Sequence, residues 1–89
     1  MSWKVVFEGG ALKELQKLDK SVKERIIDFL ENRLSVAENP RSLGAALRGS
    51  KLGEFWKYRV GDYRIIAKIH DAEILITVVR IGSRKEVYR

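Results

Sequence analysis

Residues 56–64 read WKYRVGDYR, and this stretch decides how the second half of the chain folds. Apolar and polar side chains alternate on both sides of residues 61–62, which is the pattern of two antiparallel strands joined by a tight turn. Glycine at the first central position is what a two-residue type II′ turn requires. A turn of this length fixes the pairing of the strands and places Arg59 directly opposite Arg64.

The two faces of the predicted hairpin differ in character, because successive side chains of a strand point to opposite sides. The face expected to pack against helices carries Trp56, Tyr58, Val60, Tyr63, Ile65, Ala67 and Ile69. The other face carries Lys57, Arg59, Arg64 and Lys68, with Leu75, Thr77 and Val79 of the following strand beside them. Like charges directly opposite each other weaken a sheet, and we expect no acidic residue on this face to neutralise them. This favours a polyanion as the partner of the basic face, and an ordinary solvated sheet face is the alternative.

The first half of the sequence predicts a strand followed by two helices. Residues 3–7 alternate between apolar and polar side chains and lead into two glycines, which favours a strand. Apolar residues recur at helical spacing over 11–18, and residues 21–24 have the Ser-x-x-Glu form of a capping box that begins a second helix. The proline at position 40 is expected to end that helix, because the residue before a proline is disfavoured in the helical conformation.

The second half predicts a loop and three strands. Residues 41–53 contain three glycines and are expected to form a loop with one short helical turn over 43–47. Strands are expected at residues 55–60, 63–69 and 74–81. The order of elements indicates the α+β class. Because 89 residues suffice for one hydrophobic core, we expect a single domain that spans residues 1–89.

Positive charge is concentrated in the second half of the chain. Residues 1–40 contain seven Lys or Arg and seven Asp or Glu, whereas residues 41–89 contain eleven and five, so the net charge of +6 lies after residue 40. This segregation favours a polyanion partner. The chain has no cysteine and one histidine, which argues against the usual metal sites, and we expect no metal or cofactor. No apolar run approaches the ~20 residues of a membrane span, and the N-terminus lacks a signal-peptide pattern, so we expect a cytoplasmic protein without membrane contact.

Four segments of the chain together resemble the RelE/ParE superfamily of bacterial and archaeal toxins. They are ALKELQKLDKSVKERI at 11–26, LRG at 47–49, WKYRVGDYRII at 56–66 and GSRKEVYR at 82–89. The resemblance spans nearly the whole chain and implies a twisted antiparallel sheet with two N-terminal helices packed on one face. RelE-type members are ribosome-dependent endoribonucleases that cut mRNA in the A site, and a cognate antitoxin holds them inactive. The partners implied for this chain are therefore an antitoxin, the ribosome and mRNA.

The resemblance also implies which side chains carry the activity. By it the catalytic positions are Lys57, Arg59, Arg64, Arg84 and Tyr88. Further contacts to RNA or the ribosome are expected at Arg48, Lys51, Lys68, Lys85 and Arg89. The family reaction is attack of a ribose 2′-OH on the adjacent phosphate without a metal ion. Clustered cations suit this reaction, because they stabilise the negative charge of its transition state.

Two positions depart from the family pattern. Some RelE proteins have lysine where this chain has Arg59, and many relatives have histidine where this chain has Ser83. Arginine is a poor general base because it stays protonated. The base is therefore open between Lys57, Tyr88 and a group of the ribosome, while Arg84 is expected to act on the departing 5′ oxygen.

Three aromatic or imidazole side chains are not assigned to the site. His70 is expected in a turn away from the basic face, and Trp3 and Trp56 are expected in the core. Two other functions stay open for the whole chain. One is that of ParE-like members, which bind DNA gyrase and need no catalytic cations, and the other is a basic RNA- or ribosome-binding module without hydrolytic activity.

Overall fold

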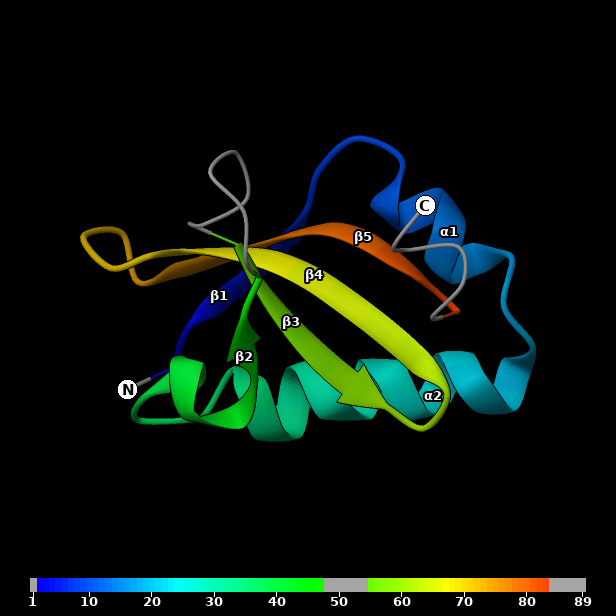
Figure 1. The fold of residues 1–89 in the computed structure, drawn as a ribbon, viewed down its shortest axis with the longest axis horizontal. Coiled ribbons are helices and arrows are strands. Elements are labelled where there is room, and N and C mark those ends of the chain that lie inside the picture. Colours follow the sequence, from blue (N-terminus) through cyan, green and yellow to red (C-terminus); the bar gives the residue numbers. More distant parts are fainter. Residues whose placement is uncertain (1, 48–54, 84–89) are drawn as a thin grey trace.

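The computed structural model describes residues 2–47 and 55–83, which form a curved sheet beside helices (Figure 1). In chain order the elements are β1 (Lys4–Phe7), α1 (Ala11–Gln16), α2 (Lys20–Phe29), a π-helical turn (Leu30–Leu34), a 3-10 turn (Pro40–Leu43), β2 (Ala45–Ala46), β3 (Phe55–Val60), β4 (Tyr63–His70) and β5 (Leu75–Ser83). No helix among these residues is long and apolar enough to cross a membrane. The predicted α+β class is confirmed.

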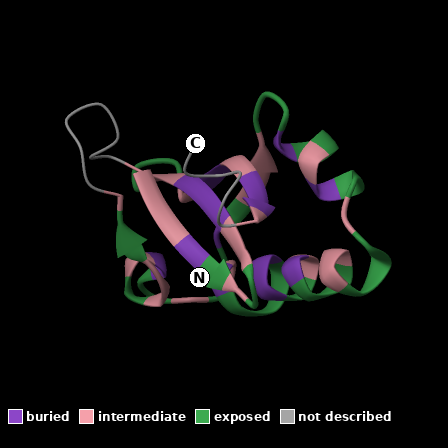
Figure 2. Cartoon of the chain, turned by 45° about the vertical axis from the view of Figure 1, so that its right-hand side comes forward, coloured by how far each residue is buried: buried purple, intermediate pink, exposed green. Residues whose placement is uncertain are grey.

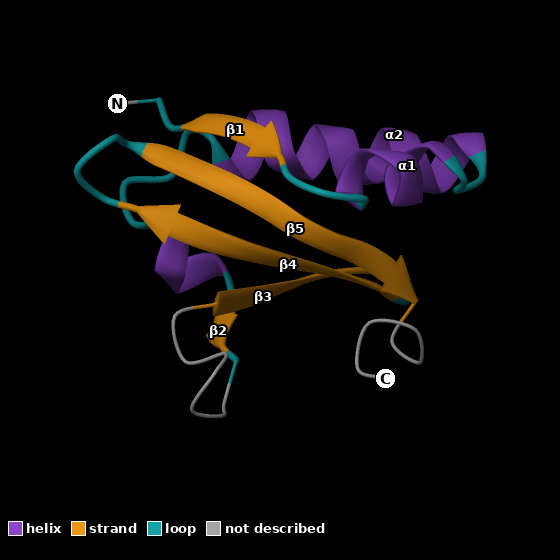
Figure 3. Ribbon diagram, turned by 90° about the horizontal axis from the view of Figure 1, so that it is seen from above, coloured by secondary structure: helices purple, strands orange, loops and turns teal. Residues whose placement is uncertain are grey.

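The sheet is mixed, with strand order β1-β5-β4-β3-β2. β1 runs parallel to β5, and the other neighbouring pairs are antiparallel. The expectation of an antiparallel sheet is therefore wrong at one edge. Parallel neighbours need a long crossover connection, and here the helices and the segment from β2 to β4 separate β1 from β5 in the chain. Seen from above in Figure 3, α1 and α2 lie on one side of the sheet.

The β3–β4 hairpin has the register that its turn predicts. Val60 pairs with Tyr63, Arg59 pairs with Arg64, and the pairing continues without a break to the far end of β3. Gly61 has a φ of 61°, which a side chain would disfavour. The basic side chains therefore share the face of the sheet that was predicted for them.

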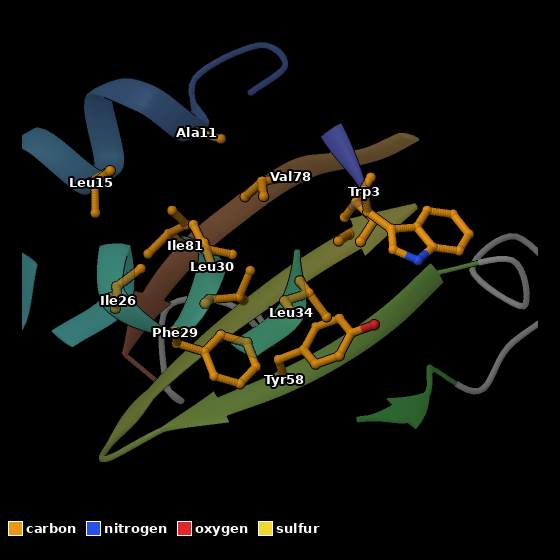
Figure 4. Close-up of a cluster of buried hydrophobic side chains, with 13 residues drawn as sticks. Trp3, Ala11, Leu15, Ile26, Phe29, Leu30, Leu34, Tyr58, Val78 and Ile81 are labelled. Carbon is orange, nitrogen blue, oxygen red and sulfur yellow. The ribbon is translucent and has the colours of Figure 1, made fainter. Parts of the chain in front are cut away.

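The helices pack on the other face through a continuous apolar core, part of which is drawn in Figure 4. Its buried members are Trp3, Ala11, Leu15, Ile26, Phe29, Leu30, Leu34, Tyr58, Ile65, Ala67, Ile76, Val78 and Ile81. The tilted rings of Phe29 and Tyr58, with centroids 5.7 Å apart, join α2 to β3. Trp56 is half-buried against this core. Both tryptophans therefore lie on the apolar side, as predicted.

A β-bulge changes the register between β4 and β5. Ala67 pairs with Val78, whereas Ile66 pairs with Arg80, so Val79 is an extra residue in β5. Val79 was predicted to lie beside Leu75 and Thr77 on the basic face, and the bulge leaves it without a direct partner in β4, whereas Arg80 takes the paired position opposite Ile66. Bulges bend a strand and increase its local twist. The bulge accordingly lies where β5 continues past the end of β1.

The exposed edge of β5 beyond β1 is closed by α1. Glu14 accepts a hydrogen bond from the backbone N–H of Ile81 at 2.9 Å and a second one from Nε of Arg80 at 3.3 Å. The carboxylate thus replaces the strand that would otherwise pair there. An edge strand with satisfied backbone groups is a poor template for pairing with another chain.

The limits of the second helix differ from the predicted ones. The helix begins at Lys20 after Asp19, and no side chain caps it, so the expected capping box is absent and the residue at 21 lies inside the first turn. The helical segment ends at Leu34, before the proline. The carbonyl of Ser35 accepts a hydrogen bond from the backbone N–H of Trp3, the N–H of Ser35 donates to the carbonyl of Leu30, and the Ser35 hydroxyl donates to the Trp3 carbonyl at 2.7 Å. This contact with the N-terminal segment ends the helix.

Candidate functional site

A cleft of about 490 Å³ opens where β3 and β4 meet the short strand β2. It is lined by Ser42, Leu43, Gly44, Ala45, Lys57, Tyr58, Arg59 and Arg64. The three cations come from the basic face of the hairpin, and the small residues come from the turn before β2 and from the first residue of β2. Figure 2 shows β2 as an exposed strand beside β3.

Two arginines on neighbouring strands of the hairpin line this cleft. Arg59 and Arg64 are directly paired residues of β3 and β4. Nε of Arg59 donates to the carbonyl of Gly61, and Nη1 of Arg64 donates to the carbonyl of Tyr63, both at 3.2 Å. Within residues 2–47 and 55–83 neither arginine forms an ion pair with a carboxylate. Their positive charge is therefore available to an anion from outside the chain.

The strands leave room for Arg64 and provide a firm base beneath the cations. Gly82 is the β5 partner of Arg64, so no side chain competes for the space on that side. Ile66 and Thr77 lie on the same face and are only 4% and 6% exposed. A buried, partly apolar base keeps the backbone under the cations rigid and lowers the local dielectric, which strengthens their interaction with an anion.

Lys68 lies on the basic face but away from the cleft. Its ammonium nitrogen is 5.0 Å from the centroid of the Phe55 ring, which is a cation–π distance. Lys68 pairs with Phe55 at the end of the hairpin remote from the turn. Its predicted contact with RNA would therefore be a peripheral one.

Gly44 lines one wall of the cleft and was not among the site residues predicted from the sequence. A methyl group at this position would collide with the carbonyl oxygen of Lys57 and would lie 2.7 Å from the ring of Tyr58. Only glycine therefore allows the turn before β2 to approach β3 so closely. The expected helical turn over 43–47 is in fact a 3-10 turn followed by β2. The small residues at 44–46 were the available signal for a close approach of backbone.

Tyr58 supports the cleft and is not itself a proton acceptor. Its hydroxyl donates to the carbonyl of Pro40 at 2.9 Å, which fixes the turn before β2 against β3. Burial raises the pKa of Tyr58 to about 12, and the positive charge of Arg41 opposes this shift. The phenol therefore stays neutral at physiological pH.

Arg41 connects the turn before β2 to the turn between β4 and β5. Its guanidinium donates two hydrogen bonds to Asp71, at 2.9 and 2.7 Å, and lies 5.7 Å from the centroid of the Trp56 ring. The hydrogen bonds from Arg41 hold the pKa of Asp71 below its usual value, and the pKa of Arg41 is raised in turn. A bidentate pair of this kind fixes both orientation and position.

Several predicted site residues fall outside the part of the chain that the structure describes. They are Arg84 and Tyr88 of the catalytic set, and Arg48, Lys51, Lys85 and Arg89 of the expected RNA or ribosome contacts. Their roles stay predictions. His70, which was expected in a turn, is instead the last residue of β4, and its Nε2 is 3.1 Å from Oγ1 of Thr77. This contact gives the imidazole a structural partner at the far end of the basic face.

The fold and the cleft together define a class of protein: a small basic α+β domain that carries arginines on the face of a mixed sheet opposite its helices. Comparison with known proteins narrows this class. The family model described as the ParE toxin of the type II toxin–antitoxin system, parDE, matches residues 5–88. The chain belongs to this toxin family, within the RelE/ParE superfamily that its motifs resemble.

Similar proteins in this superfamily are RelE toxins. A RelE-like toxin protein from Escherichia coli is 34% identical over 85 residues, which cover 96% of this chain and 86% of that protein. The mRNA interferase toxin RelE of Escherichia coli strain K12 is 32% identical over 90 residues, which cover 99% of this chain and 92% of that protein. A chain in the crystal structure of the toxin–antitoxin complex RelBE2 from Mycobacterium tuberculosis has a TM-score of 0.84 at 26% identity, and the match covers 94% of this chain and 93% of that chain. The predicted RelE-like fold is thereby confirmed.

Proposed function

We propose that this toxin is a ribosome-dependent endoribonuclease that cuts mRNA in the ribosomal A site without a metal ion. The observation that carries the proposal is the facing pair of Arg59 and Arg64, which borders a cleft and has no carboxylate partner in the described part of the chain. An enzyme of phosphate chemistry needs such fixed positive charge where the phosphate binds. The activity named for the Escherichia coli K12 relative, mRNA interferase, supports the same reading.

In the proposed reaction the ribose 2′-oxygen attacks the adjacent phosphorus. A base takes the 2′-OH proton, the bond from phosphorus to the 5′ oxygen breaks, and that oxygen leaves with a proton. The products are a 2′,3′-cyclic phosphate and a 5′-OH end. Arg59 and Arg64 stabilise the extra negative charge on the phosphate oxygens, because preorganised charges act most strongly on a transition state. Lys57 lines the same cleft and is the described candidate for the base.

Two further roles fall on the C-terminal residues. Arg84 donates to the departing 5′ oxygen, and Tyr88 stacks on a base and orients the 2′-OH. The proton acceptor is Lys57, Tyr88 or a group of the ribosome. Single-turnover cleavage, measured against pH in a Lys57 variant and a Tyr88 variant, identifies which of them it is. A ribosomal base predicts that neither variant changes the profile.

A cognate antitoxin is the second proposed partner. The RelBE2 structure from Mycobacterium tuberculosis is that of a toxin–antitoxin complex, and this chain matches one of its chains over nearly its full length. An antitoxin that inhibits this protein must cover the cleft or prevent the toxin from entering the ribosome.

Inhibition of DNA gyrase is the second candidate function, because the family model that matches this chain is that of the ParE toxin. Mapping of 5′ ends on ribosome-bound message in a translating extract, together with a gyrase supercoiling assay, separates the two functions. We expect cuts within A-site codons and unchanged supercoiling. Inhibited supercoiling without cuts would support the gyrase function instead.

A matched pair of double variants tests whether the cationic pair is responsible. Arg59→Ala/Arg64→Ala should abolish the cuts, whereas Lys13→Ala/Lys17→Ala, which removes the same charge from exposed positions of α1 and its C-terminal end, should retain them. An equal loss of cleavage in both double variants would show that net charge, and not the position of Arg59 and Arg64, is responsible.

A further inference from the structure

A second groove, of about 290 Å³, lies on the helix side of the β3–β4 turn. It is lined by Arg25, Asp28, Phe29, Arg33, Arg59, Val60 and Gly61. Three of its seven lining residues are arginines, two from the helical segment and one from the hairpin. The two arginines from the helical segment, Arg25 and Arg33, are not among the cations predicted from the sequence or from the family resemblance.

Helical geometry aligns the two arginines of this groove. Arg25, Phe29 and Arg33 follow one another at intervals of four residues, which places them along one side of the helical segment. The guanidinium carbon of Arg33 is 5.9 Å from the centroid of the Phe29 ring. The guanidinium of Arg25 lies against the hairpin turn, where its nitrogens would be 3.4 Å from a Cβ atom at Gly61. The groove therefore has a built shape, with an aromatic ring beneath one guanidinium and backbone beside the other.

The charge of this groove is poorly neutralised. Its single acidic residue is Asp28, which accepts a hydrogen bond from Asn32 at 2.7 Å. Among the described residues neither Arg25 nor Arg33 forms an ion pair, although both are exposed. Guanidinium groups bind phosphates through two parallel hydrogen bonds, which makes clustered arginines a typical phosphate site.

Arg59 connects the groove to the catalytic cleft, because it lines both. The two sites lie on opposite sides of the same hairpin, one on the basic face and one beside α2. A phosphodiester chain that enters the cleft can therefore reach the groove past Arg59.

We propose that this arginine groove binds the phosphate backbone of RNA outside the segment that is cut. The inference rests on the proposed function and extends it to a second contact region. RNA is favoured over an acidic peptide because Arg59 lines both this groove and the cleft where the scissile phosphate is proposed to bind.

Salt-dependent binding tests the groove directly. Full-length wild type, Arg25→Gln/Arg33→Gln and the charge-matched control Lys13→Gln/Lys17→Gln are titrated against two probes. The probes are a fluorescein-labelled single-stranded RNA of about 20 nucleotides with 2′-O-methyl riboses, long enough to pass the cleft, and 30S ribosomal subunits without message. Titrations between ~50 and 200 mM KCl give the slope of log K against log salt concentration.

The groove variant should lose two phosphate contacts. Its salt slope should be shallower than that of wild type by about 1.4 to 1.8, because each contact contributes about 0.7 to 0.9. The control should keep the wild-type slope. A shallower salt slope of the groove variant with the oligonucleotide would assign the groove to the message. A shallower slope with the 30S subunit would assign it to ribosomal RNA. Circular dichroism and thermal melting verify that all three proteins are equally folded.

Slopes that equal the wild-type slope with both probes would overturn the inference. Loss of binding to the cognate antitoxin, with both RNA slopes unchanged, would assign the groove to an acidic protein segment and overturn it as well. Cleavage of ribosome-bound message by the same wild-type preparation is measured first. Absence of cleavage refutes the proposed function, whereas cleavage combined with an unchanged slope in the variant refutes the groove.

Discussion

The two faces of the β3–β4 hairpin are made by the same strands but are stabilised in opposite ways. Toward the helices, Tyr58 and Ile65 are 1% and 0% exposed and contribute by burial. Toward the cleft, their neighbours Arg59 and Arg64 face each other as like charges and form hydrogen bonds with the backbone of the hairpin. One face therefore supplies the free energy of folding, and the other keeps an unfavourable arrangement that a ligand can relieve.

The largest expected effect is on stability, from Ile65→Ala on the buried face. Removing this fully buried side chain should cost about 2–5 kcal/mol of unfolding free energy, measured by urea denaturation. The milder Ile65→Val should cost about 0.5–1.5 kcal/mol. Equal losses for the two variants would show that the core relaxes around this position.

Arg64→Ala, one residue away in sequence, should have the opposite profile. Single-turnover cleavage of ribosome-bound message should slow by about 10²–10³-fold, as expected when a transition-state contact is lost. Unfolding free energy should be unchanged or rise by a few tenths of a kcal/mol, because repulsion from Arg59 is relieved. A stability loss as large as that of Ile65→Ala would make Arg64 a structural residue.

Gly44→Ala tests the close approach between the turn before β2 and strand β3. The added methyl group would collide with β3, and overpacking of this kind typically costs about 1–3 kcal/mol. Gly10→Ala is the matched control, because nothing lies within 4 Å of a Cβ atom at that position. Thermal melting compares the two variants, and equal melting temperatures would mean that the turn before β2 moves aside without cost.

The smallest expected effect is the pH dependence of the contact between Arg41 and Asp71. Because the folded-state pKa of Asp71 is lowered, its contribution to stability is present above the ordinary value of 3.8 and is lost as the pH falls through the lowered value. The difference in melting temperature between wild type and Asp71→Asn should therefore shrink to zero in strong acid. Both side chains are at least partly exposed, so we expect a small difference at neutral pH. A difference that does not change between neutral and strongly acidic pH would assign the effect to something other than this carboxylate.

The hairpin could be predicted from sequence because its register depends on local information. Gly61 and the residue after it set the turn, and strict alternation then assigns each side chain to a face. The bulge at Val79 could not be predicted, since the apolar residues around it continue without a local break. The end of the second helix was equally hidden, because Ser35 is held by Trp3, far away in the chain.

The candidate site was predictable to a similar degree. The cations were visible because Arg59 and Arg64 lie opposite each other in a register that the turn fixes. The wall at Gly44 was not visible, because its importance depends on the approach of β2 to β3. Arg25 and Arg33 resembled ordinary solvent-facing residues of an amphipathic helix, and only the placement of the hairpin turn beside α2 brings them to Arg59.

The parallel pairing of β1 with β5 also determines the order in which a newly made chain can fold. Lys4 in β1 is synthesised long before its partner Leu75 in β5. Pairings between residues so distant in sequence form late. The first strand must therefore wait for β5, and the toxin can complete its sheet only after β5 has left the ribosome that made it.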